Sequence, residues 1–149
     1  MSDLTVAMLW PRHTSNVGVL ARTCEAVGAT FVTTTDVEVT CNTPGVPPLR
    51  LRPSDVDSWV RHRAMRQTVI AVECEGRPLQ SFTPPPPGMQ TTLLLGNERN
   101  GVPSELLSRD DVEVASLRQV GLSPSINVAV AGSVAAYWFA NLLNPAVPA

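Results

Sequence analysis

Short apolar runs rich in β-branched residues recur along the chain, with helical segments between several of them. They predict five strands, at residues 4–10, 29–35, 68–74, 91–95 and 112–117. The fourth run is almost wholly apolar, which is typical of a parallel strand that is covered on both faces. Strands that alternate with helices favour an α/β fold, in which helices cover both faces of a parallel sheet.

Apolar residues at helical spacing predict four helices, at about 16–27, 54–66, 103–107 and 125–143. Gly28 would stop the first helix, and Pro124 or Ser125 would open the last. The proline-rich stretches 36–53 and 76–88 predict irregular connections, and we expect no regular helix or sheet in the second. Its four consecutive prolines indicate a stiff surface segment, with a docking site for a proline-recognising partner as the less favoured alternative.

The composition predicts one folded domain over residues 1–149. Hydrophobic residues make up 44% of the chain and charged residues 16%, which argues against disorder. The formal net charge of −2 argues against a protein that coats nucleic acid by bulk electrostatics. All 11 positive residues are arginine, which suits bidentate phosphate contacts, although a coding bias explains the pattern at least as well.

Targeting and redox features favour a soluble, cytoplasmic protein without a membrane partner. The N-terminal residues lack the basic start and long apolar stretch of a signal peptide, and no run reaches the roughly 18 apolar residues of a membrane span. Cys24, Cys41 and Cys74 lack the paired spacing of zinc or redox sites. We therefore expect no metal, and reduced, buried thiols, above all at Cys24 and Cys74.

Three polar segments follow the first, fourth and fifth predicted strands, at residues 11–22, 96–103 and 117–127. The carboxyl ends of parallel strands meet at one edge of the sheet, where α/β proteins bind ligands. We therefore expect a site built from these segments. Neither a Gly-Lys-Ser/Thr phosphate loop nor a G-x-G-x-x-G dinucleotide loop is present. Taken singly, the first segment suits a capped helix better than a site. The second suits an ordinary strand-to-helix loop as well as a site, and the third a capped core helix as well as a site.

The three segments carry motifs in a fixed order. The first has the pattern N-x-G-x-x-x-R, with Asn16, Gly18 and Arg22. The second has the pattern L-G-x-E-x-x-G-x-P, formed by Leu95, Gly96, Glu98, Gly101 and Pro103, and the third is S-I-N-V-A-V-A at 125–131. Together they resemble the motifs of the SpoU (TrmH-like) branch of the SPOUT RNA methyltransferases, over about residues 4–143.

The resemblance implies a parallel α/β sheet whose C-terminal part forms a trefoil knot. It implies S-adenosylmethionine as cofactor, S-adenosylhomocysteine as product, and a homodimer in which two subunits build each site. The glycine- and alanine-bearing face of the last helix would fit the dimer interface. The expected reaction is methylation of a ribose 2′-hydroxyl, in tRNA rather than rRNA, because the chain resembles the minimal single-domain members. An rRNA methyltransferase and a catalytically silent, cofactor-binding RNA-interaction protein are the alternatives.

The motifs also imply roles for individual residues. Those associated with catalysis and active-site organisation are Asn16, Arg22, Glu98 and Asn127. Arg22 would hold the nucleotide phosphate and stabilise the developing alkoxide, with a role as base as the alternative. The implied cofactor-binding residues are Val72, Leu95, Gly96, Asn97, Gly101, Leu117, Gln119 and Ser125. The candidate RNA contacts are Arg12 and His13, at the mouth of the first segment, and Arg118.

One run departs from the family's pattern. Relatives usually carry Ile-Pro-Met or Ile-Pro-Gln before the third motif, where this chain has Leu117-Arg118-Gln119. Losing the proline frees the backbone of a turn that lines the cofactor, and Arg118 brings a charge there. Either Arg118 contacts RNA phosphate or the cofactor pocket differs from that of the relatives.

Overall fold

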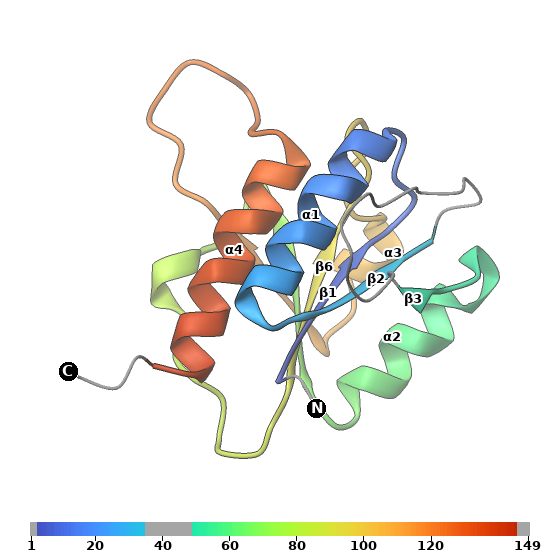
Figure 1. Ribbon diagram of the computed structural model, residues 1–149, viewed down its shortest axis with the longest axis vertical. Coiled ribbons are helices and arrows are strands. Elements are labelled where there is room, and N and C mark those ends of the chain that lie inside the picture. The colour runs from blue at the N-terminus through green and yellow to red at the C-terminus, as the bar shows by residue number, and fades with distance from the viewer. Residues whose placement is uncertain (1–2, 35–48, 146–149) are drawn as a thin grey trace.

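The centre of the molecule is a seven-stranded, wholly parallel sheet, seen in a computed structural model that describes residues 3–34 and 49–145 (Figure 1). The strand order across the sheet is β3-β2-β1-β6-β4-β7-β5. The strands are β1 (Leu4–Met8), β2 (Thr30–Thr33), β3 (Leu49–Arg50), β4 (Thr68–Glu73), β5 (Arg77–Pro78), β6 (Thr91–Leu95) and β7 (Val112–Ser116). All five strands predicted from the sequence are present.

Four helices within the described residues cover both faces of the sheet, which confirms the predicted α/β class. On one face lie α1 (Thr14–Val27) and α4 (Val128–Leu143), side by side (Figure 1). On the other lie α2 (Val56–Ala64) and α3 (Ser104–Leu107). Gly28 ends α1 as predicted, since its φ of 74° is a left-handed conformation that glycine adopts without steric cost.

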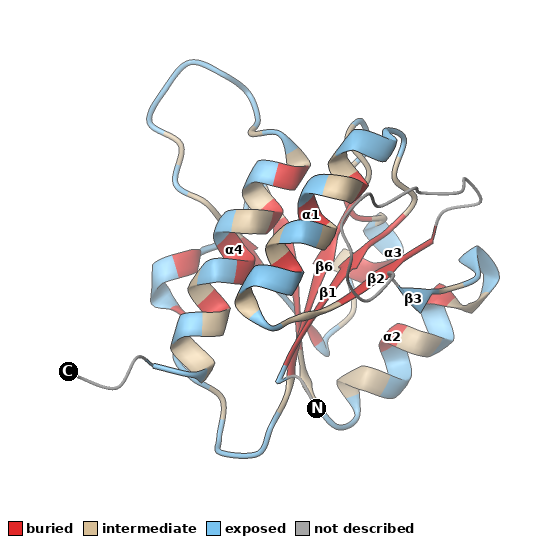
Figure 2. Ribbon diagram, viewed as in Figure 1, coloured by how far each residue is buried: buried red, intermediate tan, exposed pale blue. Residues whose placement is uncertain are grey.

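The strands at the centre are buried on both faces because successive side chains of a strand point in opposite directions. Leu93 and Leu95 of β6 pack with Phe139 of α4, whereas Leu94 packs with Val60 of α2. Each of these side chains is at most 1% exposed. Full burial of one such side chain contributes roughly 1.5–3 kcal/mol. Figure 2 shows this buried centre between helices whose outer faces are exposed.

The small residues of α4 face the interior of the chain. A Cβ on Gly132 would press against the Leu95 side chain and lie 2.8 Å from Leu20 Cδ2. Ala135 and Ala136 are fully buried in the same layer. The prediction that this glycine- and alanine-bearing face forms a dimer interface is therefore wrong. Small residues here let α4 approach α1 and the sheet closely within one chain.

The last helix begins later than the sequence predicted. It starts at Val128 rather than near 125, because Asn127 forms the N-cap. The Asn127 Oδ1 accepts hydrogen bonds from the N–H groups of Ala129 and Val130, at 2.8 and 3.2 Å. Ser125 therefore lies in the preceding loop and not in the helix.

The two proline-rich connections contain short edge strands that the sequence did not predict. The stretch 76–88 includes β5 and a 3-10 turn, η2 (Leu79–Ser81). Pro78 fits in β5 because an edge strand tolerates a missing N–H. Within the stretch 36–53, strand β3 pairs with β2, while 36–48 lie outside the described residues.

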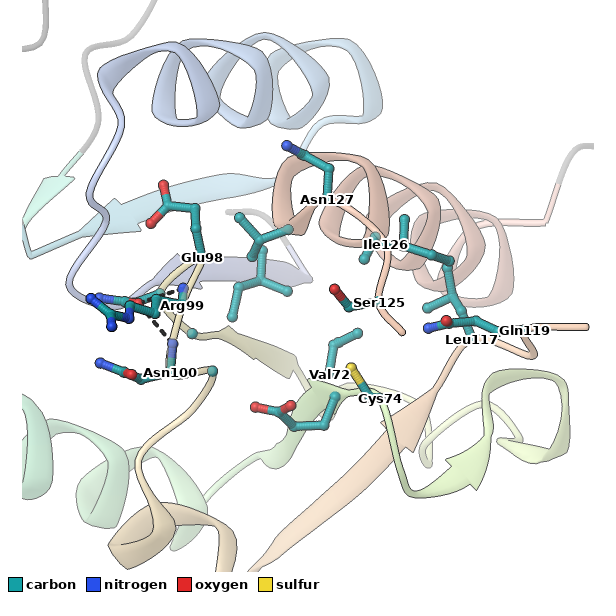
Figure 3. A pocket seen from close by; sticks show the side chains of 17 residues that line it. Val72, Cys74, Glu98, Arg99, Asn100, Leu117, Gln119, Ser125, Ile126 and Asn127 are labelled. Carbon is teal, nitrogen blue, oxygen red and sulfur yellow. Dashed lines mark hydrogen bonds between the residues drawn. The ribbon is translucent and has the colours of Figure 1, made fainter. Parts of the chain in front are cut away.

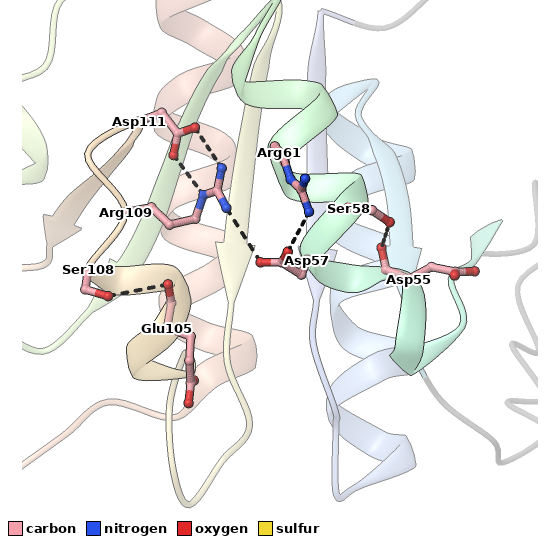
Figure 4. Close-up of polar contacts among 8 residues, drawn as sticks. All are labelled: Asp55, Asp57, Ser58, Arg61, Glu105, Ser108, Arg109 and Asp111. Atoms are coloured by element: carbon pink, nitrogen blue, oxygen red, sulfur yellow. Dashed lines mark hydrogen bonds and ion pairs between the residues drawn. The ribbon is translucent and has the colours of Figure 1, made fainter.

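Charged side chains connect α2 to the segment after α3 (Figure 4). The Arg109 Nε lies 2.8 Å from Asp111 Oδ1, and Arg109 Nη1 lies 3.6 Å from Asp57 Oδ1. Arg61 Nη2 lies 3.1 Å from the other oxygen of Asp57. Exposed ion pairs of this kind contribute at most about 1 kcal/mol each. We therefore assign this network to the surface structure and not to a ligand site.

Candidate functional site

A cavity of about 340 Å³ opens at the carboxyl edge of the sheet, where β4 and β6 end (Figure 3). Val72 and Leu95, at the ends of these strands, form apolar parts of its wall. Residues 96–101 line one side and residues between 117 and 128 line the other. The volume falls in the range typical of small-molecule sites. The structure thus has a cavity at the edge where the sequence predicts a site.

Residues 96–101 form a tight turn that depends on glycine. A Cβ on Gly96 would overlap the backbone of Gly101, which itself has a φ of 69°. The N–H of Asn97 donates to the Gly101 carbonyl at 3.3 Å, and the Gly101 N–H donates back at 2.9 Å. The Asn97 Oδ1 accepts from the N–H groups of Arg99 and Asn100, at 2.8 and 3.0 Å. The loop therefore holds its own shape.

The Glu98 carboxylate connects this loop to the other two motifs. Its Oε2 accepts from the backbone N–H of Arg12 at 2.8 Å. Its Oε1 accepts from the N–H of His13 and from Asn16 Nδ2, both at 3.0 Å. The Asn16 Oδ1 in turn accepts from Asn127 Nδ2 at 3.3 Å. One chain of hydrogen bonds therefore joins residues from all three sequence motifs.

These hydrogen bonds also keep Glu98 ionised. Burial, the largest single influence, would by itself raise the pKa of the carboxyl group. The hydrogen bonds from Asn16 and from the backbone N–H groups, including those of Arg12 and His13, together outweigh burial and lower the pKa below its ordinary value. Glu98 is therefore suited to fixing the loops and not to exchanging protons near neutral pH.

The positions that the resemblance implies for cofactor binding lie together in the cavity. All eight line it: Val72, Leu95, Gly96, Asn97, Gly101, Leu117, Gln119 and Ser125. Glu98 and Asn127 line it as well. In Figure 3, Leu117, Gln119 and Ser125 lie across the cavity from Glu98. Their contact with a cofactor stays a prediction.

The remaining predicted site residues do not line the cavity of this chain. The Arg22 side chain is exposed on α1. Arg12 and His13 are exposed too. They are connected to the site through their backbone N–H groups, which donate hydrogen bonds to the Glu98 carboxylate. Arg118 is exposed between two residues that do line the cavity. Asn16 contributes through its hydrogen bonds, so the segment 11–22 supports the site instead of forming its wall.

Several cavity residues were missed by the sequence analysis. Glu73 and Cys74, which lie outside the three predicted segments, line the cavity at the end of β4. Ile126 and Val128, which belong to the third motif but had no assigned role, line it beside α4. The position of Glu73 in the sequence could have identified it. It is an acidic residue at the carboxyl end of a predicted parallel strand, and this is the edge of the sheet where the other site segments lie. Glu73 and Cys74 stand at this edge without the glycine-rich or polar run that marks the other segments.

The cysteines divide between core and cavity. Cys24 is buried, and its burial raises the pKa of the thiol to about 12, so it stays protonated. Cys74 is exposed, so the prediction of a buried thiol there is wrong, because β4 ends at the preceding residue. Cys41 lies outside the described residues. In the described part of the chain, no group of three or more His, Cys, Asp and Glu could hold a metal ion.

These features place the chain among the α/β proteins that bind a small molecule at the carboxyl edge of a parallel sheet. A comparison with known families is more specific. The chain belongs to the SpoU rRNA methylase family, which matches residues 3–137. No helix in residues 3–34 and 49–145 is long and apolar enough to cross a membrane.

Individual relatives agree with this assignment. The chain is similar to the tRNA (guanosine(18)-2′-O)-methyltransferase TARBP1 of Mus musculus, at 31% identity over an alignment of 144 residues that covers 88% of this chain. It is also similar to the AdoMet-bound rRNA methyltransferase of Sinorhizobium meliloti, with a TM-score of 0.76 and 25% identity over 93% of this chain. A structure that concerns the 2-OH methylation of C/U34 on tRNA gives the same TM-score, identity and coverage of this chain.

The relatives differ greatly in length from the present chain. It spans 9% of the mouse protein and 55% of the Sinorhizobium chain, but 95% of the chain in the C/U34 structure. The match to the last of these extends over almost the whole of both chains.

Proposed function

We propose that this chain binds S-adenosylmethionine in the cavity and transfers its methyl group to a ribose 2′-hydroxyl of RNA. The observation that carries the proposal is the hydrogen-bonded chain from Glu98 through Asn16 to Asn127, which joins three motifs around one cavity. The names of the relatives support it, since they include a tRNA 2′-O-methyltransferase and an AdoMet-bound enzyme. They also favour tRNA over rRNA as the substrate, because the C/U34 structure matches over nearly its full length.

The cavity suits this cofactor in size and chemistry. Val72, Leu95 and Leu117 offer apolar surface for an adenine ring. Gly96, which has no side chain, lets a ligand approach the backbone closely. Glu73 places a carboxylate, which can accept hydrogen bonds from a ligand, at the wall of the site. The similarity to solved family structures also supports the trefoil knot as part of this proposal.

The chemistry requires one bond to form as another breaks. The cofactor supplies a methyl group on sulfonium, which an oxygen nucleophile can attack. A C–O bond forms at the ribose 2′-oxygen, the C–S bond breaks, and S-adenosylhomocysteine is the second product. The hydroxyl proton passes to a neighbouring phosphate or to water. The loops of this chain align the two reactants, and good alignment lowers the barrier by roughly 7–11 kcal/mol.

Arg22 has the part of an electrostatic stabiliser in this proposal. A guanidinium keeps its proton in proteins, so it suits a phosphate contact and a developing alkoxide better than the role of base. Arg22 is exposed and does not line the cavity of its own chain, and we propose that a second copy supplies it. Each site of the proposed homodimer therefore combines the cavity of one subunit with Arg22 of the other.

An exposed apolar patch supports this arrangement. It comprises Val19 on α1 and Val130, Val134 and Tyr137 on α4, which are all exposed. The three α4 residues follow one another at helical spacing on one outer stripe. Arg22 lies one turn beyond Val19 on the same exposed side of α1. Apolar patches with polar surroundings mark protein–protein interfaces, and a second copy here would carry Arg22 into the interface.

Exposed hydrogen-bond donors around the cavity suit RNA phosphates. Arg12 and His13 lie next to Glu98, and Arg118 lies between Leu117 and Gln119. Since Arg118 does not line the cavity, the structure favours the reading in which it contacts RNA phosphate over the one in which it changes the cofactor pocket. The cytoplasm, where tRNA is abundant, is the compartment we propose.

The test of the proposed function is a methyl-transfer assay with radiolabelled S-adenosylmethionine, followed by mapping of the labelled nucleosides. We expect 2′-O-methylated nucleosides in total tRNA. Label in rRNA alone would replace tRNA by rRNA as the substrate. Cofactor binding without label in either RNA would identify a catalytically silent RNA-interaction protein instead.

Arg22→Ala tests the proposed role of this residue. We expect methyl transfer to fall by about 100-fold or more, as for loss of one stabiliser of transition-state charge, while cofactor binding survives. Arg66→Ala is the matched control, because Arg66 is also exposed but follows α2 on the other face of the sheet. Unchanged turnover in Arg22→Ala would remove this residue from the mechanism.

A further inference from the structure

Glu73 is the last residue of β4, and its carboxylate lies against the wall of the cavity. Its Oε1 accepts a hydrogen bond from the backbone N–H of Val102, at 2.5 Å. A Cβ built on Gly101, which lines the cavity, would lie 2.5 Å from Oε1 and 3.1 Å from Oε2. Both carboxylate oxygens are therefore next to the segment 101–102 that closes this side of the site.

The two acidic side chains of the cavity differ in how many partners they have. Glu98 accepts three hydrogen bonds, which occupy both of its oxygens. Glu73 accepts one at Oε1, and within residues 3–34 and 49–145 its Oε2 has no hydrogen-bond or ion-pair partner. A carboxylate has about four lone-pair positions, so most of the acceptor capacity of Glu73 is unused.

We infer that Glu73 binds the ribose of the nucleoside in the cavity, with Oε2 accepting hydrogen bonds from the 2′- and 3′-hydroxyls. This inference rests on the proposed function and names the residue that recognises the sugar of its cofactor. Val72, directly before Glu73, and Leu95 supply the apolar surface that suits an adenine ring, and the ribose is attached to that ring. An acidic residue after a parallel strand binds ribose hydroxyls in dinucleotide-binding α/β proteins as well.

Glu73→Gln separates this role from a structural one. The glutamine side-chain oxygen can still accept the Val102 N–H, whereas its amide nitrogen cannot accept a hydroxyl proton. We expect calorimetric affinity for S-adenosylhomocysteine to fall by about 10-fold, as for loss of a hydrogen bond to a charged group. The thermal midpoint of the free protein should stay unchanged. An unchanged affinity in this variant would overturn the inference.

Ligands without the amino-acid tail identify the group that Glu73 binds. 5′-Methylthioadenosine keeps the ribose but lacks the ammonium group, so Glu73→Gln should weaken its binding by the same factor. If the variant weakens S-adenosylhomocysteine but not 5′-methylthioadenosine, Glu73 binds the ammonium group and the inference is wrong.

Ligands that lack one ribose hydroxyl test whether Glu73 contacts that hydroxyl. The 2′-deoxy and 3′-deoxy analogues of 5′-methylthioadenosine should bind the wild-type protein more weakly than the parent, and the penalty should shrink or vanish in Glu73→Gln. If removing a hydroxyl weakens binding equally in the wild type and in Glu73→Gln, Glu73 does not contact the ribose hydroxyls. Full affinity of the wild type for both deoxy analogues would contradict the contact as well, and this measurement needs no variant. Failure of the wild type to bind S-adenosylhomocysteine at all would instead contradict the proposed function.

Discussion

Residues 96–101 and residues 118–126 flank the same cavity, and the protein holds them in different ways (Figure 3). In the first loop, Asn97 and Gly101 exchange backbone hydrogen bonds, and the Glu98 carboxylate accepts three more. In the second loop, residues 118–126 make no hydrogen bond to any described residue. Val120 is 84% exposed and Leu122 is fully exposed.

The difference shows which part of the site the chain can build alone. The 96–101 loop is fixed by bonds that need no ligand, so it presents a preformed wall. The loop after β7 extends away from the body in Figure 1, so its exposed groups are free to contact a ligand or a second subunit. We therefore expect changes in the first loop to affect folding and binding together, and changes in the second to affect binding or assembly alone.

The largest effect should come from Gly96→Ala. The added Cβ would overlap the backbone of Gly101, so we expect the free energy of unfolding to fall by about 3 kcal/mol and cofactor binding to be lost. Gly121→Ala is the matched control in the other loop, where a Cβ would meet nothing within 4 Å. Chemical denaturation and calorimetric titration measure both quantities. Equal destabilisation by the two variants would contradict the contrast between the loops.

The next largest effect should come from Glu98→Ala, which leaves the N–H groups of Arg12 and His13 and the Asn16 amide without their acceptor. We expect a loss of about 2 kcal/mol in the free energy of unfolding at pH 7. The pKa of Glu98 is lowered on folding, so its contribution is present above the ordinary pKa of 4.5 and is lost as pH falls through the lower, folded value. The difference between wild type and variant should therefore shrink below about pH 4. A difference that is independent of pH would show that the carboxylate charge is not involved.

A smaller effect is expected from Asn127→Ala, which removes the N-cap of α4 and should cost about 1 kcal/mol. Asn127→Asp keeps an oxygen for the N–H groups of Ala129 and Val130 but cannot donate to Asn16. We expect Asn127→Asp to retain most of the stability of the free protein and to lose cofactor affinity. If the aspartate variant unfolds as easily as the alanine variant, the link to Asn16 and not the cap stabilises α4.

The smallest effect on folding should come from the double substitution Val120→Ser and Leu122→Ser. Both side chains are exposed, so we expect the free energy of unfolding of the dilute protein to change by less than about 0.5 kcal/mol. Loss of more than 1 kcal/mol at low protein concentration would show that the loop packs against its own chain. Analytical ultracentrifugation of the same variant tells whether these residues contribute to assembly.

The parts of the fold that follow from local pattern were predictable from the sequence. The central strands and α1 are marked by apolar spacing and by Gly28, which act within a few residues. The edge strands β3 and β5 were not predictable, because two residues have no periodicity and their pairing depends on β2 and β7. The start of α4 was misjudged because a serine and a proline near 125 are also common helix-opening residues.

The site shows the same limit. Gly96 and Ser125 could be placed from motif positions, whereas the contact of Glu73 with Val102 spans 29 positions and exists only in the folded chain. Small residues in α4 fit close packing within a chain as well as between chains, and only the position of Gly132 beside Leu20 distinguishes the two. Arg22 is the opposite case: its motif position singled it out, whereas the structure places it in an exposed position on α1, outside the cavity of its own chain.

Hydrogen–deuterium exchange with and without S-adenosylhomocysteine tests the central claim most directly, namely that a nucleoside cofactor binds between the fixed loop and the open one. We predict slow exchange at 96–102 in the free protein, fast exchange at 118–126, and strong protection of 118–126 when the ligand is added. Protection confined to segments outside the cavity, or none at saturating ligand, would contradict the account.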